Sequence, residues 1–265
     1  MNRKIEDIKK INVSKPLKLD CGKIVKDFPL AYETYGALNE NKDNAILVFH
    51  ALTGDQFVAG TNPITKKEGW WVTAVGPNKA IDTNKYFVIC ANVIGGCMGS
   101  LGPSDKDKET DQSYGLDFPV ITIKDIVRAQ ESLLDHLSIK KLLCATGGSM
   151  GGMQLLQFCA TFPDKTFSAI PIACSASHSA QNIALNELAR QAIMADPVWD
   201  NGKYFLKNTQ PKNGLAVARM VGHISYLSEQ GMQERFGRKL QEKADYEFSF
   251  NADFQVESYL RHQGN

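Results

Sequence analysis

The sequence predicts an α/β fold in which helices cover a mainly parallel sheet. Continuous apolar runs of strand length recur along the first two thirds of the chain, as buried parallel strands do. Segments with helically spaced apolar residues separate these runs, an alternation typical of right-handed strand–helix–strand crossovers. After Cys174 no convincing buried strand follows, which predicts a helical lobe at the end of the chain.

Each predicted element has a local signal. Aromatic and β-branched residues and a D-C-G turn predict short edge strands near 17–24 and 30–36. The predicted buried strands are 45–50, 86–94, 142–146 and 167–174. The predicted helices are 121–137, 150–162, 182–195, 214–229 and roughly 252–262. We therefore expect an α/β core over residues 1–177 and a helical lid lobe over residues 178–265.

Composition excludes several classes of protein. With 43% apolar and 22% charged residues, the 265-residue chain has the composition of a soluble globular protein. Its 30 basic and 29 acidic residues leave a net charge of +1, which favours neither nucleic acid nor a membrane surface as partner. The six cysteines are scattered without a C-x-x-C pair, and the N-terminus is too charged for a signal peptide. We expect a cytoplasmic protein without a metal site.

The strongest motif surrounds one serine. Residues 146–154 read T-G-G-S-M-G-G-M-Q and place G-x-S-x-G between a predicted strand and a predicted helix, the context this motif requires. A nucleophile raised above the sheet edge sits on a sharp turn, so residues two positions away on either side must lack a Cβ. We predict Ser149 as nucleophile and the Met150 N–H as an oxyanion donor. The alternative is a glycine-rich turn that binds phosphate or packs closely.

A second motif, H-A-L-T-G at 50–54, directly follows a predicted buried strand. In proteins with a nucleophile elbow this loop supplies the second oxyanion N–H, which predicts Leu52. His50 lies too early in the chain for a catalytic base, and we expect it to hold the loop in shape by hydrogen bonding.

A third cluster lies in the predicted lobe, where Arg219, His223 and Tyr226 have the spacing i, i+4 and i+7 on one helix. Two interpretations remain open from spacing alone. The face is either solvated, or Arg219 binds a substrate carboxylate while Tyr226 donates a hydrogen bond.

Together these motifs resemble the homoserine O-acetyltransferase family. The resemblance rests on G-G-S-M-G-G-M-Q, H-A-L-T-G, G-W-W at 69–71, N-V-I-G-G-C-M-G-S-L-G-P-S at 92–104, S-A-Q-N-I-A at 179–184 and A-R-M-V-G-H-I-S-Y at 218–226. It runs from about residue 14 to the last residue. The resemblance implies an α/β-hydrolase fold, a homodimer, a role in methionine biosynthesis and acetyl-CoA as co-substrate, with no permanently bound cofactor.

The resemblance also implies roles for residues. Ser149 takes an acetyl group from acetyl-CoA and passes it to L-homoserine by a ping-pong mechanism. The Leu52 and Met150 amides form the oxyanion hole, Arg219 contacts the homoserine carboxylate, and Tyr226 lies beside it.

A serine nucleophile needs a base and an acid that orients the base, and the family places both on late strands after the lobe. His178, His223 and His262 lack that context, so we interpret them as structural. The chain then resembles the N-terminal two-thirds of the family, lacking the last strands and both the triad Asp and His. We expect a truncated form with little activity alone. Alternatives are an O-succinyltransferase or serine hydrolase of the same fold, and a non-catalytic binding fragment.

Overall fold

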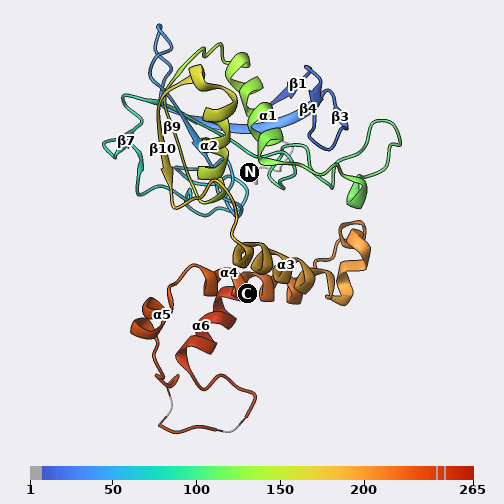
Figure 1. Ribbon diagram of the computed structural model, residues 1–265, viewed down its shortest axis with the longest axis vertical. Helices are drawn as coiled ribbons and strands as arrows, with labels where there is room; N and C mark the ends of the chain where they lie inside the picture. Colours follow the sequence, from blue (N-terminus) through green and yellow to red (C-terminus); the bar gives the residue numbers. More distant parts are fainter. Residues whose placement is uncertain (1–7, 243, 248) are drawn as a thin grey trace. The chain divides into compact units, whose positions relative to one another are not determined.

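The computed structural model describes residues 8–242, 244–247 and 249–265. The chain divides into two compact units, Met1–Ala176 and Ser177–Asn265, each with its own internal packing (Figure 1). The first contains the strands of the main sheet, and the second is helical. The division lies one residue before the predicted boundary between 177 and 178.

The first unit is built on a six-stranded sheet with the order β1-β4-β8-β5-β9-β10. Its strands are β1 (Lys10–Val13), β4 (Phe28–Tyr35), β5 (Ala45–Phe49), β8 (Phe87–Ala91), β9 (Leu142–Gly148) and β10 (Thr166–Ile172). The last four run parallel to one another, whereas β4 pairs antiparallel with both β1 and β8. Because the carboxyl ends of parallel strands share one edge, the loops after β5, β8 and β9 gather there.

Two helices of the first unit pack on each other and on the sheet, α1 (Ile123–His136) and α2 (Met150–Thr161). A capping box at Thr122 starts α1, and its apolar stripe is buried in the same core as strands β5 and β9. Phe158 of α2 packs on Phe49 of β5 with ring centroids 5.7 Å apart. This packing fixes α2 against the strands whose ends carry the predicted site.

The remaining elements of this unit are short. They are the antiparallel pair β2 (Leu17–Lys18) and β3 (Ile24–Val25), the parallel pair β6 (Val75–Gly76) and β7 (Ile81–Asp82), and the 3-10 helices η2 (Gly115–Asp117) and η3 (Pro163–Lys165). The predicted strand near 17–24 is thus a two-strand hairpin around the D-C-G turn.

All four predicted core strands form, but two burial predictions are wrong. The segment near 30–36 is not an edge strand, because β4 lies inside the sheet and Leu30 is fully buried. β10 is not a buried strand, because it is the outermost strand of the described sheet and exposes Phe167 (77%) and Ile170 (55%). An apolar run indicates a strand, whereas its burial depends on which neighbours cover it.

The second unit consists of helices, α3 (Ala180–Met194), α4 (Lys212–Ser225), α5 (Glu229–Arg235) and α6 (Gln255–Gly264), with 3-10 helices η4 (Pro197–Gly202) and η5 (Tyr204–Lys207). α4 packs against both α3 and α6. The Asp196 carboxylate accepts a 2.9 Å bond from the Gly214 N–H and so ties the end of α3 to the start of α4.

The three helices predicted for the lobe are confirmed as α3, α4 and α6, with shifted ends. The prediction of one helix over 214–229 is wrong at its end, because α4 stops at Ser225 and Ser228 caps the separate helix α5. Within the described parts of the chain, no helix has the length and apolar content needed to cross a bilayer.

Candidate active site

Ser149 occupies a strained turn between β9 and α2. Its φ of 54° and ψ of −123° lie in a region that residues with a Cβ rarely adopt. Such a conformation costs roughly 1–3 kcal/mol and persists only where its surroundings hold it. Here the Ser149 N–H donates to the Ile172 carbonyl at 3.0 Å, and its carbonyl accepts from the Met153 N–H at 3.0 Å. The turn is therefore held by both β10 and the first turn of α2.

The glycines around Ser149 differ in what they do. A Cβ on Gly151 would overlap the Phe49 carbonyl oxygen, and a Cβ on Gly147 would lie 2.8 Å from the same oxygen. These are the positions two residues either side of Ser149, as predicted. A Cβ on Gly148 would lie 3.9 Å from its nearest neighbour, the Ile172 carbonyl oxygen. Close approach of α2 to the end of β5 thus requires Gly147 and Gly151 but not Gly148.

The predicted oxyanion donors come from two segments of the first unit. Met150 begins α2, where a helix leaves its first N–H groups without an intrahelical acceptor, and the Ser149 side chain does not cap this end. Leu52 lies in the loop after β5, with its side chain 72% exposed. The contact between Gly151 and Phe49 brings the two segments together at the carboxyl edge of the sheet.

His50 sets the orientation of the loop that carries Leu52. The His50 Nε2 accepts a 3.1 Å bond from the Val93 N–H, so the proton of the neutral imidazole must sit on Nδ1. The Nδ1–H then donates to the Ala51 carbonyl at 2.8 Å. In a trans peptide the Leu52 N–H points opposite to the Ala51 carbonyl, so the bond that draws this carbonyl to the imidazole turns the N–H away from it.

His50 is not available as a catalytic base. Both ring nitrogens are engaged, the side chain is 1% exposed, and burial lowers the pKa of the imidazole although its bond to Ala51 acts in the opposite direction. His136, the other histidine of this unit, ends α1 beside Asp135, at the edge where β9 begins. Neither histidine of the first unit is placed to take a proton from Ser149.

The same edge contains buried polar groups that sequence reasoning missed. Asn92 follows β8, and its side-chain oxygen accepts from the Met98 N–H at 3.3 Å. The Ser100 hydroxyl donates to the Asn92 carbonyl at 2.7 Å and accepts from the Ala31 N–H at 2.9 Å. These bonds fold the 92–104 loop beside His50. The sequence signal that could have found these groups is a polar residue, Asn92, directly after an apolar strand.

Arg219 and Tyr226 belong to the second unit. The Arg219 Nε–H donates to the Gln263 carbonyl of α6 at 2.8 Å, which orients the guanidinium. Tyr226 caps the end of α4 and is 72% exposed, and its ring lies 5.9 Å from that of His223. The Tyr259 hydroxyl lies 3.0 Å from the His223 Nδ1, a structural contact between α4 and α6.

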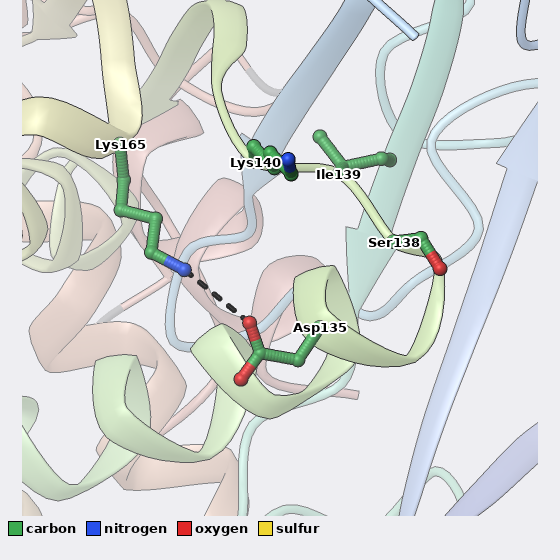
Figure 2. A pocket seen from close by; sticks show the side chains of 5 residues that line it. All are labelled: Asp135, Ser138, Ile139, Lys140 and Lys165. Carbon is green, nitrogen blue, oxygen red and sulfur yellow. Dashed lines mark hydrogen bonds and ion pairs between the residues drawn. The ribbon is translucent and has the colours of Figure 1, made fainter.

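A hollow of about 570 Å³ lies at the opposite edge of the sheet from Ser149. It is lined by Asp135, Ser138, Ile139, Lys140 and Lys165 (Figure 2). These residues end α1 and precede β9 and β10, so they lie where those strands begin, whereas Ser149 lies where β9 ends. Lys165 bridges to Asp135 at 3.3 Å and to Glu131 at 2.9 Å, and this hollow has no part in the predicted site.

The sequence is similar to a family of known fold and to relatives of known name. A family model described as "alpha/beta hydrolase fold" matches residues 44–259. The homoserine O-acetyltransferase of Pelagibacter ubique is 67% identical over 98% of this chain and 70% of its own length. That of Mesorhizobium japonicum is 58% identical over 96% of this chain and 66% of its own.

Solved structures with a similar fold include a homoserine O-acetyltransferase and an esterase. The crystal structure of homoserine O-acetyltransferase from Bacillus anthracis has a TM-score of 0.85 at 27% identity and covers 97% of this chain and 69% of that one. The crystal structure of esterase E22 has a TM-score of 0.82 at 29% identity and covers 97% of this chain and 71% of that one.

The strand–serine–helix turn and these matches define an α/β-hydrolase-fold protein, and the predicted fold class is confirmed. Within that class the chain belongs to the homoserine O-acetyltransferase family, as its motifs indicated. It spans about two thirds of the length of these relatives, 70% of the first and 66% of the second.

The contact at Gly151 predicts a stability difference within the elbow. Gly151→Ala places a methyl group against the Phe49 carbonyl, and we expect the free energy of unfolding to fall by about 1–3 kcal/mol or more. Gly148→Ala, the matched control, should change it by less than about 1 kcal/mol because the site has room. Urea denaturation of the two variants and wild type checks this. Equal losses in both variants would contradict the packing argument.

The buried His50 predicts a pH dependence of stability. Because its pKa is lowered in the folded state, the unfolded chain takes up the proton more readily, so stability is lost as the pH falls below the ordinary histidine value of about 6.5. The free energy of unfolding should therefore be lower at about pH 5.5 than at about pH 7.5, by at most about 1.4 kcal/mol per pH unit.

Urea denaturation at both pH values measures this difference. His50→Gln should remove most of it, and His136→Gln, at an exposed position, should retain it. The interpretation is wrong if His50→Gln keeps the wild-type difference in the free energy of unfolding between the two pH values.

Proposed function

We propose that this chain carries the acyl-accepting part of a homoserine O-acetyltransferase, which moves an acetyl group from acetyl-CoA to the hydroxyl of L-homoserine in methionine biosynthesis. The observation that supports this most strongly is the strained elbow at Ser149, in a chain 67% identical to a relative of that name. A strained serine between a strand and the helix that follows it is typical of a nucleophile elbow.

Ser149 acts first. Its Oγ attacks the thioester carbonyl carbon, the proton of the hydroxyl passes to a base, and the carbon–sulfur bond breaks as CoA leaves with a proton. The homoserine hydroxyl then attacks the acetyl-serine ester, its proton is removed, and the Ser149 Oγ leaves and regains a proton. The base is a residue other than His50 or His136. The absence of the triad Asp and His from residues 1–265 stays a prediction.

The oxyanion formed in each step accepts hydrogen bonds from the Leu52 and Met150 amides. Support comes from the N–H groups at the start of α2, which the Ser149 side chain does not cap, and from the His50 bond that turns the Leu52 N–H away from the imidazole. Donors held in place before the reaction stabilise the transition state without reorganising, and one such donor contributes about 10²–10³ in kcat.

Arg219 and Tyr226 bind the acceptor in this proposal. The bond from Arg219 to Gln263 uses the Nε–H, which leaves the terminal nitrogens for a carboxylate. Tyr226 is exposed one helical turn beyond His223 and can donate its hydroxyl proton to homoserine.

Three further properties belong to the proposal and follow from the family. Acetyl-CoA is a co-substrate rather than a bound cofactor, the functional assembly is a homodimer, and the protein works in the cytoplasm. The cysteines of the described residues are free thiols, which suits a reducing compartment.

A serine hydrolase is the second candidate function. It is supported by the similarity to esterase E22, which shares the fold at nearly the same TM-score as the acetyltransferase structure. The two functions differ only in whether homoserine or water attacks the acyl-enzyme, so exclusion of water decides between them.

Acylation of Ser149 can be tested with an activated ester. We expect wild type treated with p-nitrophenyl acetate, whose leaving group needs no proton and whose attack can release the Ser149 hydroxyl proton to water, or with acetyl-CoA to gain the mass of one acetyl group. Ser149→Ala should gain none, and Ser168→Ala, a serine of β10 bonded to the Leu143 carbonyl, should behave as wild type. Intact-mass spectrometry measures the products. Equal labelling of Ser149→Ala would refute the nucleophile assignment.

The fate of the acetyl group separates the two candidate functions. Added L-homoserine should remove it as O-acetylhomoserine, whereas acetate as the main product would favour the hydrolase. Succinyl-CoA in parallel tests the other acyl donor.

The acceptor site predicts a change in KM. Arg219→Lys loses the planar fork, so the KM for L-homoserine should rise at least about tenfold with little change in the KM for acetyl-CoA. Arg190→Lys is the matched control, because Arg190 lies on α3 and pairs with Glu187. Steady-state kinetics of O-acetylhomoserine formation measure both values. A similar rise in both variants would contradict the role of Arg219.

A further inference from the structure

The two proposed oxyanion donors lie on segments that are far apart in the sequence. Leu52 follows β5, and Met150 begins α2. Both must hold their positions relative to one oxygen atom, because a donor displaced by about 1 Å loses most of its effect. The Gly151–Phe49 contact limits how close the segments come. A contact of that kind prevents closer approach but does not prevent separation.

One buried side chain connects the two segments. Gln154 lies one turn into α2 and is fully buried, and its Nε2 donates a 3.0 Å hydrogen bond to the His50 carbonyl. His50 in turn directs the Ala51 carbonyl through its Nδ1–H. The bond therefore joins the helix that carries Met150 to the peptide immediately before the Leu52 donor.

The orientation of the Gln154 amide is fixed from its other side. A carbonyl can only accept, so Gln154 must present its NH₂ to His50 and its oxygen to Gln130. The Gln130 Nε2 donates to the Gln154 Oε1 at 3.1 Å. Among the described residues, no protein group donates to the buried Gln130 Oε1.

We propose that Gln154 is a positioning residue that holds the two donors of the oxyanion hole in register, with Gln130 fixing its orientation. This inference rests on the proposed function for its catalytic consequence. Its structural part, the connection between α2 and the 50–54 loop, stands without it.

Amide hydrogen exchange of the peptide spanning residues 50–56 tests the structural part in the 265-residue chain. Gln154→Met keeps the length of the side chain and removes the donor, so exchange of this peptide should accelerate at least about fivefold. Gln130→Met leaves the bond to His50 and should give a smaller acceleration. Gln157→Met is the control, because Gln157 lies one turn further along α2 and its side chain bonds to Thr161 at 2.8 Å.

The catalytic part is tested by kinetics of O-acetylhomoserine formation. In Gln154→Met we expect kcat to fall about tenfold to a hundredfold with both KM values within about twofold of wild type, because the oxyanion exists only in the transition state. Loss of packing alone would change exchange throughout α2 and would not separate kcat from KM.

The outcomes separate this inference from the proposed function. Unchanged exchange of the 50–56 peptide in Gln154→Met, or the same acceleration in Gln157→Met, overturns the inference. If the wild-type chain gains no acetyl group at Ser149, the proposed function fails on that measurement, and the exchange result still decides whether Gln154 holds the loop. A thermal melt of each variant identifies unfolding. If Gln154→Met does not fold, Gln130→Met decides, and unchanged exchange of the 50–56 peptide in Gln130→Met overturns the inference.

Discussion

The structure around Ser149 depends on one close backbone contact, between the first turn of α2 and the last residue of β5. Gly147 and Gly151 both face the Phe49 carbonyl, at separations that leave no room for a Cβ. This contact sets where α2 begins, and therefore where Ser149 turns and where the Met150 N–H points. The strain at Ser149 is tolerated because β10 and α2 hold its backbone from both sides.

A buried polar network extends this contact to the neighbouring loop. The His50 ring accepts a hydrogen bond from the Val93 N–H and donates one to the Ala51 carbonyl. The His50 backbone carbonyl accepts a hydrogen bond from the Gln154 side chain. Apolar residues in these places would avoid burying polar groups such as the Gln130 oxygen, to which no protein group in the described part of the chain donates. Hydrogen bonds fix the direction in which each peptide plane points, and apolar packing does not.

Much of this arrangement was predictable from local signals. Apolar runs and helical spacing located the strands and helices, since these patterns depend only on neighbours in sequence. The G-x-S-x-G turn and the H-A-L-T-G loop were found because their chemistry needs particular residues at fixed spacing. The role of Gln154 was not found, because a glutamine inside a helix has many uses and its partner lies 104 positions away in the chain.

Burial was less predictable than secondary structure. β10 has the composition of a covered strand, yet it is the outermost strand of the described sheet and exposes Phe167. β4 was expected at an edge and instead lies between β1 and β8. Strand order is set by crossovers between distant segments, and a local pattern carries no information about it.

By itself, the sequence determined the fold class, the family and the serine at the elbow, because each depends on residue types at short spacing. The tertiary structure decided which glycines are required, which tautomer His50 adopts and how α2 connects to the loop of Leu52. These properties depend on contacts between segments that only the folded chain brings within hydrogen-bonding distance.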